Sequence, residues 1–253
     1  MDLVQQGFKK KVAFCLKGTV SKKGSKHQRF YEKNDLYRNG EYIDYNMVRD
    51  SIFKHIVTSN PDFDFDFFLH GWNLDLENHL RDIYNPKKFL FENNSNYNEV
   101  ISSVINNGSD FGGVSGGLSL KKSIELKEIY EIESNVVYDY VIIYRYDILL
   151  WKDIILHNYD LNNYIYVNGW DGSCNADFHF IMSNSNSHKF KYLFDSVKLY
   201  DNTHKFHHWI KNYTQNIIKC NIIEDSIIAG IDQEHMRVIG NDINLLNMIE
   251  NKK

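Results

Sequence analysis

The chain has 253 residues, 43% of them hydrophobic and 25% charged, which suffices to bury the core of one large domain or two small ones. Its net charge of −4, without a basic tail or stripe, argues against a dedicated nucleic-acid-binding protein. No apolar run approaches the ~20 residues of a membrane helix, and the first residues do not resemble a signal peptide, so a cytoplasmic protein without a membrane span is expected.

Predicted strands and helices alternate over the first half of the chain. Short apolar runs that end in a polar or glycine-containing loop predict strands at 11–16, 63–70 and 88–92. Apolar residues at helical spacing predict helices at 41–59, 75–84, 97–105 and 118–134. The glycine-rich stretch 108–117 is interpreted as a linker that leads into the last of these helices.

The strand predicted at 138–144 is the strongest in the chain, because nearly all of its residues are β-branched or aromatic, and it is expected to be central. The segments after it are predicted to be strands at 164–168 and 177–182 and helices at 187–200, 206–213 and 226–231. This order predicts a Rossmann-like α/β fold, with a mostly parallel central sheet and helices on both faces. Since the chain has no repeats and no proline-rich linker, a single domain is expected.

Polar residues directly follow several of these predicted strands. Ligands of open parallel α/β sheets bind beyond the carboxyl ends of the strands. That rule selects Lys17-Gly18, 70–73, 145–147 and the segment around Asp177. The third of these is the most informative, because an apolar strand ends there in two charges at alternate positions, which face the same side of an extended chain.

From the residues alone, Arg145 and Asp147 have two interpretations. Burying such charges without partners would cost several kcal/mol, so one interpretation is an internal ion pair that caps the strand. The other is a site for a diphosphate or its metal ion. In that case Asp147 would supply oxygen ligands to Mg²⁺ or Mn²⁺, and Arg145 would neutralise phosphate.

The order of segments resembles a family of GT-A-type glycosyltransferases found in polysaccharide-synthesis clusters of bacteria and in large DNA viruses. The resemblance covers roughly residues 10–200 and lies in KVAFCLKG (11–18), DFFLHGWN (66–73), NPKKFLFE (85–92), SLKKSIELKEIYEIE (119–133), YDYVIIYRYDILL (138–150) and NADFHFIMS (175–183). It implies a GT-A-like domain that binds the nucleotide with about 10–150 and the acceptor with about 151–253. For a viral member, it implies action in the host cytoplasm.

The resemblance also implies roles for individual residues. The family's nucleotide-sugar-binding positions fall on Leu16, Lys17, Gly18, His70, Trp72, Asn73, Arg145 and Asp147. A later aspartate on the acceptor side falls on Asp177. Because an inverting transferase needs a carboxylate near the acceptor hydroxyl, Asp177 and Asp171 are the candidate catalytic bases. Ser119 and Lys122, in the long helix, are expected to contact the nucleotide.

The family's strand ends in Arg-x-Asp or Asp-x-Asp, in place of the usual metal-binding motif. With Arg145 at the first position, the predicted metal site at Asp147 has one carboxylate fewer. Mn²⁺ or Mg²⁺ is the expected cofactor there. The arginine is the alternative source of positive charge for the departing diphosphate.

Other motifs favour structural interpretations. Asp64 and Asp66 form a literal Asp-x-Asp, but they lie inside a predicted strand and are interpreted as its polar, edge-like face. The stretch 108–117 lacks the Gly-Lys-Ser/Thr ending of a phosphate loop. The histidines within 204–208 are interpreted as a solvated helix face, and the three widely spaced cysteines as thiols in a reducing compartment.

The sequence therefore predicts a glycosyltransferase that moves a sugar from a nucleoside diphosphate sugar to a hydroxyl acceptor on a glycan, with no nucleic-acid partner. One alternative is a non-catalytic α/β module that binds glycan or nucleotide. Another is a nucleotidyltransferase, which would need a second carboxylate beside Asp147, and Asp64 and Asp66 would have to supply it.

Overall fold

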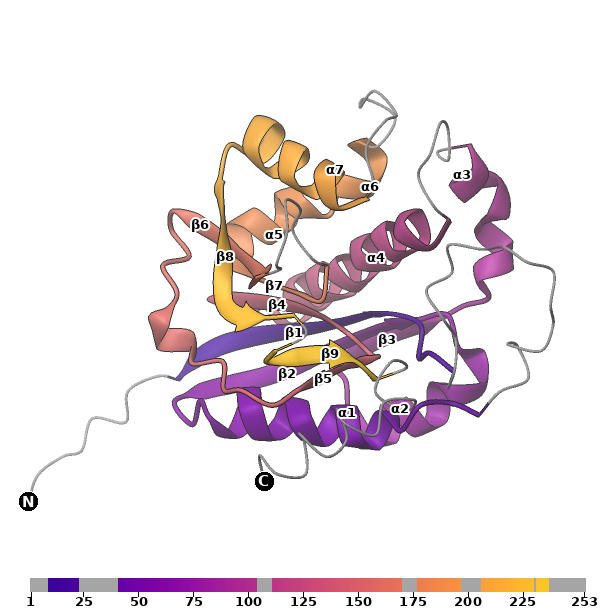
Figure 1. The fold of residues 1–253 in the computed structure, drawn as a ribbon, viewed down its shortest axis with the longest axis horizontal. Helices are drawn as coiled ribbons and strands as arrows, with labels where there is room; N and C mark the ends of the chain where they lie inside the picture. Colours follow the sequence, from indigo (N-terminus) through magenta and orange to yellow (C-terminus); the bar gives the residue numbers. More distant parts are fainter. Residues whose placement is uncertain are drawn as a thin grey trace, which may run out of the picture.

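A mixed β-sheet forms the centre of the computed structural model, and helices pack on both of its faces (Figure 1). The structure describes residues 9–22, 41–103, 111–169, 177–196, 206–229 and 231–236. Within these ranges the sheet has seven strands in the order β3-β2-β1-β4-β7-β6-β8. Most neighbouring pairs are parallel, so the predicted α/β class is confirmed.

The first half of the chain builds the parallel part of the sheet. Its strands are β1 (Lys10–Gly18), β2 (Phe63–Gly71), β3 (Lys88–Phe91) and β4 (Tyr140–Arg145). β4 lies between β1 and β7 and is central, as predicted. β3 pairs only with Phe68–Gly71 of β2, so Asp64 and Asp66 lie on the half of β2 that β3 does not cover. Their interpretation as the polar part of an edge-like strand agrees with this position.

The second half of the chain extends the same sheet. Its strands are β6 (Tyr164–Gly169), β7 (His179–Ser183) and β8 (Asn221–Ile228). β7 runs antiparallel to both β4 and β6, whereas β8 runs parallel to β6. A separate two-stranded ribbon joins β5 (Ile148–Leu150), directly after the central strand, to β9 (Gln233–His235).

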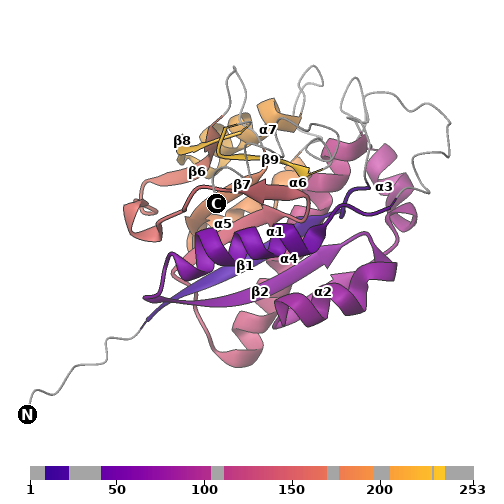
Figure 2. The same cartoon turned by 60° about the horizontal axis from the view of Figure 1, so that its bottom comes forward.

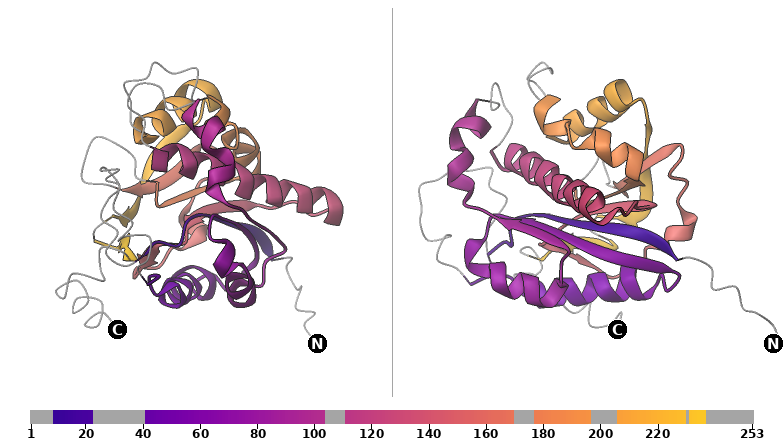
Figure 3. Two further views of the ribbon diagram at one scale, coloured as in Figure 1. Left: turned by 90° about the vertical axis from the view of Figure 1, so that its right-hand side faces the viewer. Right: turned by 180° about the vertical axis from the view of Figure 1, so that it is seen from behind.

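Two helical layers cover the sheet, and each has its own apolar core (Figures 2 and 3). One layer holds α1 (Tyr45–Ile52), the π-helical turn Phe53–Thr58, the 3₁₀ turn Leu74–Leu76 and α2 (Glu77–Tyr84). The other holds α4 (Phe111–Ser134), α5 (Asn184–Phe190), α6 (Leu193–Ser196) and α7 (Phe206–Tyr213). The remaining helical segments are the turns Asn94–Tyr97, Leu156–Asn158 and Thr214–Ile218 and helix α3 (Asn98–Ser102). Among the described helices, none is long and apolar enough to cross a membrane.

Two sequence predictions about local structure are wrong. The stretch 226–231 was expected to be helical, but β8 runs through Ile228, and its residues alternate between exposed and buried from Glu224 to Ile227, as in a strand. The glycine-rich stretch was expected to be a linker, but α4 already begins at Phe111. Burial of Val114 and Leu118 in the core outweighs the low helix propensity of the glycines.

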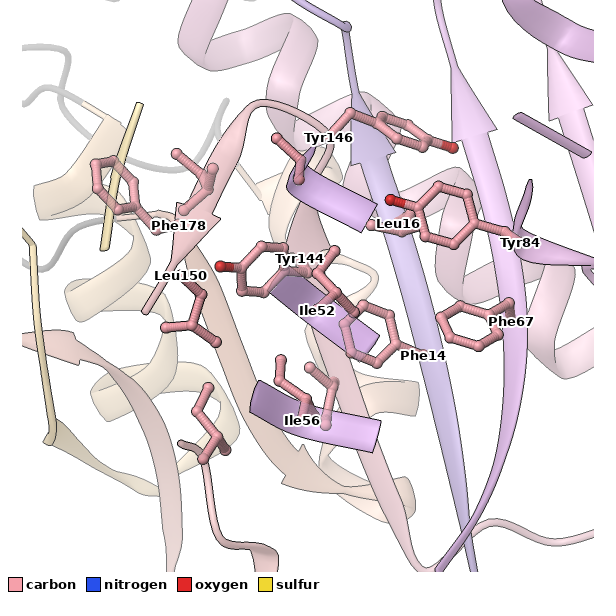
Figure 4. Packing of buried hydrophobic residues seen from close by; sticks show 14 of the residues in the cluster. Phe14, Leu16, Ile52, Ile56, Phe67, Tyr84, Tyr144, Tyr146, Leu150 and Phe178 are labelled. Carbon is pink, nitrogen blue, oxygen red and sulfur yellow. The ribbon is translucent and has the colours of Figure 1, made fainter. Parts of the chain in front are cut away.

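Aromatic rings lock the central strands against the first helical layer (Figure 4). The ring centroid of Phe14 on β1 lies 5.2 Å from that of Phe67 on β2 and 6.0 Å from that of Tyr144 on β4. Phe67 in turn lies 5.6 Å from Tyr84 of α2. Offset and tilted rings at such distances attract each other. This packing holds the strands in register, and thereby positions the residues at their ends.

Candidate active site

Charged residues at the ends of three strands meet at one edge of the sheet. Lys17 and Arg145 are direct partners in the parallel register of β1 and β4, so their side chains leave the same face at the carboxyl ends of both strands. Asp177 lies just before β7. Because β7 is antiparallel to β4, the start of β7 lies beside the end of β4. The topology therefore brings together groups that are far apart in the sequence.

One guanidinium joins two carboxylates at this edge. Nε and Nη2 of Arg145 donate to Oδ1 and Oδ2 of Asp147 at 2.9 and 3.0 Å. Nη1 of Arg145 lies 3.2 and 3.3 Å from the two oxygens of Asp177. The Nζ of Lys17 donates to Asp177 at 3.4 Å, and the hydroxyl of Ser21 donates to Asp147 at 2.7 Å. Four predicted site residues thus form one connected ionic cluster.

The members of this cluster differ in exposure. The side chains of Asp147 and Lys17 are 1% and 2% exposed, whereas those of Arg145 and Asp177 are 21% and 13% exposed. The internal ion pair considered from the sequence therefore exists. It is not closed off, however, because the outer side of the arginine reaches solvent.

The pKa values of the two cations shift in opposite directions, although both side chains are desolvated. Burial lowers the pKa of Lys17, and the neighbouring carboxylate of Asp177 offsets this only in part. Burial acts in the same direction on Arg145, but the carboxylates of Asp147 and Asp177 outweigh it and raise its pKa. The ammonium of Lys17 is therefore costly to hold in the folded chain. Such costly buried charges are typical of functional sites.

A second polar group connects β1, β2 and α4. The backbone N–H of Gly18 donates to the hydroxyl of Ser119 at 2.7 Å, and Nδ1 of His70 lies 2.7 Å from the same oxygen. Nε2 of His70 lies 3.3 Å from Glu92. Gly18 has a φ of +99°, which favours glycine, whereas an added Cβ would meet nothing within 4 Å. Backbone conformation, not space, explains the glycine at the end of β1.

Glu92 is a site residue that the sequence reasoning missed. It accepts from Lys122 at 2.8 Å and from the Tyr97 hydroxyl at 2.5 Å. The ring of Trp72 lies between those of His70 and Tyr97, at 4.5 and 5.6 Å, and its buried indole N–H has no hydrogen-bond partner in the described part of the chain. Glu92 is the last residue of the strand predicted at 88–92, so a search of the carboxyl ends of the strands could have selected it.

The other predicted site residues have different positions. Asn73 accepts from the backbone N–H of Val20 at 2.8 Å and so supports the loop after β1. Leu16 is completely buried in the core that faces the first helical layer, and its side chain does not belong to the polar edge. Asp171 lies outside the described residues.

His70 is expected to make stability depend on pH. Burial lowers its pKa to about 4, and Glu92 counteracts this only in part. The unfolded chain takes up this proton below its ordinary pKa of 6.5, while the folded chain does not. The free energy of unfolding should therefore fall as the pH drops from about 6.5 to about 4, by on the order of 3 kcal/mol from this group.

Urea unfolding of the wild type and of His70→Gln at several pH values measures this effect. The glutamine variant lacks the titration, so the stability advantage of the wild type should shrink steadily toward low pH. A difference that stays constant between pH 7 and pH 4 would show that His70 is not held neutral.

The described residues do not fit the divalent metal that the sequence led us to expect. Both oxygens of Asp147 accept from Arg145, and one also accepts from Ser21. Mg²⁺ and Mn²⁺ require several oxygen ligands around one point. Within the ranges that the structure describes, no group of three or more His, Cys, Asp or Glu residues could hold a metal. A cation at Asp147 would first have to displace the arginine, so the metal remains a prediction.

Comparisons with known proteins give similarity of fold only. No protein-family model matches the chain, and no curated protein matches it in sequence. A nucleoside-diphosphate-sugar pyrophosphorylase from Vibrio cholerae RC9 is similar in structure, with a TM-score of 0.46 and 8% identity, over 95% of this chain and 99% of that one.

Two glycosyltransferases are also similar in structure. GlyE of Streptococcus pneumoniae TIGR4 has a TM-score of 0.40 and 13% identity over 86% of this chain, which spans only 45% of GlyE. A glycosyltransferase involved in the glycosylation of the major capsid of PBCV-1 has a TM-score of 0.41 and 7% identity, over 96% of this chain and 98% of that one. Similarities this low assign no activity to this chain.

Proposed function

We propose that this chain is a cytoplasmic glycosyltransferase, which moves a sugar from a nucleoside diphosphate sugar to a hydroxyl acceptor on a glycan. One observation carries the proposal: the buried Lys17 and the partly exposed Arg145 lie side by side at the carboxyl ends of two central parallel strands. Ligands bind at this edge in open α/β sheets. Two fixed cations there can oppose the charge that develops on a departing diphosphate.

Each member of the ionic cluster has a role in this proposal. Arg145 presents its exposed side to the diphosphate, and Asp147 holds the guanidinium in place through two hydrogen bonds. Lys17 adds positive charge behind it. Asp177, with Asp171 as the alternative, accepts the proton of the acceptor hydroxyl.

The proposed transfer step follows from these positions. The acceptor oxygen forms a bond to the anomeric carbon while the bond from that carbon to the diphosphate oxygen breaks. The hydroxyl proton passes to the carboxylate, and the nucleoside diphosphate leaves with both bonding electrons. Asp177 accepts from both cations in the structure. The proposal therefore requires Lys17 and Nη1 of Arg145 to exchange Asp177 for the diphosphate, while Arg145 keeps Asp147, before Asp177 acts as a base.

The polar group around Gly18 would form the nucleotide side of the site. The backbone at Gly18, the ring of Trp72 and the unpaired indole N–H border the same edge as Lys17. His70 and Ser119 hold this edge together through their mutual hydrogen bond, so we assign them positioning roles. Lys122 is neutralised by Glu92 and would contact the donor only as part of that pair.

Isothermal titration with UDP, GDP and dTDP sugars, with and without Mn²⁺, tests the proposal, followed by an assay for nucleoside diphosphate release with glycan acceptors. Asp147→Asn should abolish donor binding, because it removes the charge that holds Arg145. Asp64→Asn is the matched control, from the Asp-x-Asp motif of β2, and should bind as the wild type does. Failure of every nucleotide sugar to bind would exclude the proposal. Binding of glycan alone would favour a non-catalytic module.

A further inference from the structure

Arg145 occupies the position between two facing carboxylates. Asp147 follows the end of β4, and Asp177 precedes the start of β7 beside it. All four carboxylate oxygens of this pair accept from the one guanidinium, at 2.9 to 3.3 Å. Two opposed carboxylates at a strand end are an arrangement that commonly binds a divalent cation. Here an organic cation of the chain itself fills that position.

The surrounding structure holds the guanidinium in this position. The hydroxyl of Ser21 donates to Asp147 at 2.7 Å, and the backbone carbonyl of Asp147 accepts from Met236 at 2.8 Å. Arg145 itself is the last residue of β4 and is paired in register with Lys17 of β1. Rotating Arg145 away would break the two charged hydrogen bonds that Asp147, which is 1% exposed, accepts from it.

Among the residues that the structure describes, the charges of this cluster are already balanced. Asp147 and Asp177 carry two negative charges, and Arg145 and Lys17 carry two positive charges. A divalent cation added to this cluster would have to bind close to two existing cations, which repel it in a partly buried setting. A guanidinium has more N–H donors than these contacts use, and the Arg145 side chain is 21% exposed. It can therefore bind a phosphate oxygen while it keeps Asp147.

We propose that Arg145 takes the place of the divalent cation, so that a nucleoside diphosphate binds directly to its guanidinium and requires neither Mg²⁺ nor Mn²⁺. The guanidinium matches the geometry of a phosphate group, with parallel N–H donors and a permanent charge. The identity of the ligand rests on the proposed function. That Arg145 fills the site between Asp147 and Asp177 rests on its contacts alone. Cation binding and nucleotide binding are therefore tested separately.

The first test measures Mn²⁺ binding to the full chain without nucleotide, by electron paramagnetic resonance after treatment with EDTA. We expect the wild type to show no site tighter than about 1 mM. Arg145→Asp, which removes the guanidinium and adds a carboxylate, should gain a site that is at least about tenfold tighter. Arg81→Asp is the control, because Arg81 also pairs with a carboxylate, that of Glu77, but on the surface. It should gain no comparable site.

Two results of this test would overturn the inference. One is a wild-type chain that binds Mn²⁺ at micromolar concentration. The other is a folded Arg145→Asp variant that gains no more Mn²⁺ affinity than Arg81→Asp. If Arg145→Asp does not fold, Arg145→Ala takes its place in the test. The alanine variant removes the guanidinium from Asp147 and Asp177 without adding a further negative charge. The measurement on the wild type needs no variant. It decides by itself whether Mn²⁺ can bind between Asp147 and Asp177 while Arg145 is present.

The second test measures the Kd of UDP, GDP and dTDP for the wild type, in EDTA and in Mn²⁺. For whichever nucleotide binds, we expect the two Kd values to agree within about twofold. A Kd at least about tenfold weaker in EDTA would overturn metal independence but leave the proposed function intact. Absence of binding in both conditions would reject the proposed function, and the Mn²⁺ measurement would still decide the role of Arg145.

Discussion

Replacing Arg145 by methionine should lower the free energy of unfolding by about 3–5 kcal/mol, because it removes the guanidinium that pairs with two buried carboxylates. Asp147, which is 1% exposed, loses two hydrogen bonds to the guanidinium, and Asp177 loses one of the two cationic partners that the structure describes. Methionine keeps the apolar stem of the side chain, so the change reports mainly on the charge. Urea unfolding followed by circular dichroism measures it.

Two further variants separate the loss of the buried ion pair from the general effect of replacing an arginine. Arg81→Met removes a partner of Glu77 from the surface, where the arginine side chain is 42% exposed, and should cost less than about 1 kcal/mol. The double variant Arg145→Met/Asp147→Leu removes both charges of the buried pair and should regain most of the loss. If Arg145→Met costs no more than Arg81→Met, the buried pair does not contribute as we describe.

Lys17→Met should abolish most of the transfer activity and leave the fold intact. Burial lowers the pKa of Lys17, so its ammonium is held at a cost, and an apolar side chain of similar length removes that cost. Asp177 keeps Arg145 as a partner. We expect the free energy of unfolding to change by no more than about 1 kcal/mol. Loss of a charge that stabilises the departing diphosphate should lower kcat by about 10²–10³.

Lys127→Met is the matched control for this prediction. Lys127 is also fully buried, but it binds Glu131 at 3.0 Å and Ser187 at 3.1 Å, between α4 and α5 and away from the ionic cluster. Its loss should destabilise the chain and leave the activity per folded molecule unchanged. The measurements are unfolding curves and turnover at saturating donor. A Lys17→Met variant that loses stability but keeps its turnover would show that Lys17 is structural.

Much of the fold could be predicted because apolar runs have a clear period. The strand ending at Leu16, the one ending at His70 and the central strand before Arg145 were found close to their observed bounds. Parallel strands present their carboxyl ends at one edge. Lys17, Arg145 and Asp177 could therefore be selected together from the sequence, although 160 positions separate Lys17 from Asp177.

Other parts of the structure depend on contacts that no local pattern encodes. The end of β8, within the stretch 226–231, was mistaken for a helix because β8 owes its extended form to pairing with β6, which is distant in the sequence. The start of α4 was missed because packing, not propensity, stabilises its glycines. Glu92 was missed because its importance comes from its neighbours Lys122 and His70.

By itself, the sequence determined the elements of the parallel part of the sheet and which polar residues end its central strands, because hydrophobic periodicity is a local property of the chain. Only the tertiary structure decided what those residues do to one another. The alternatives for Arg145 and Asp147, an internal pair or an accessible cation, depend on solvent exposure and on the distance to Asp177. Both quantities arise when β4 and β7 pair in antiparallel order, and burial then sets the cost of each charge.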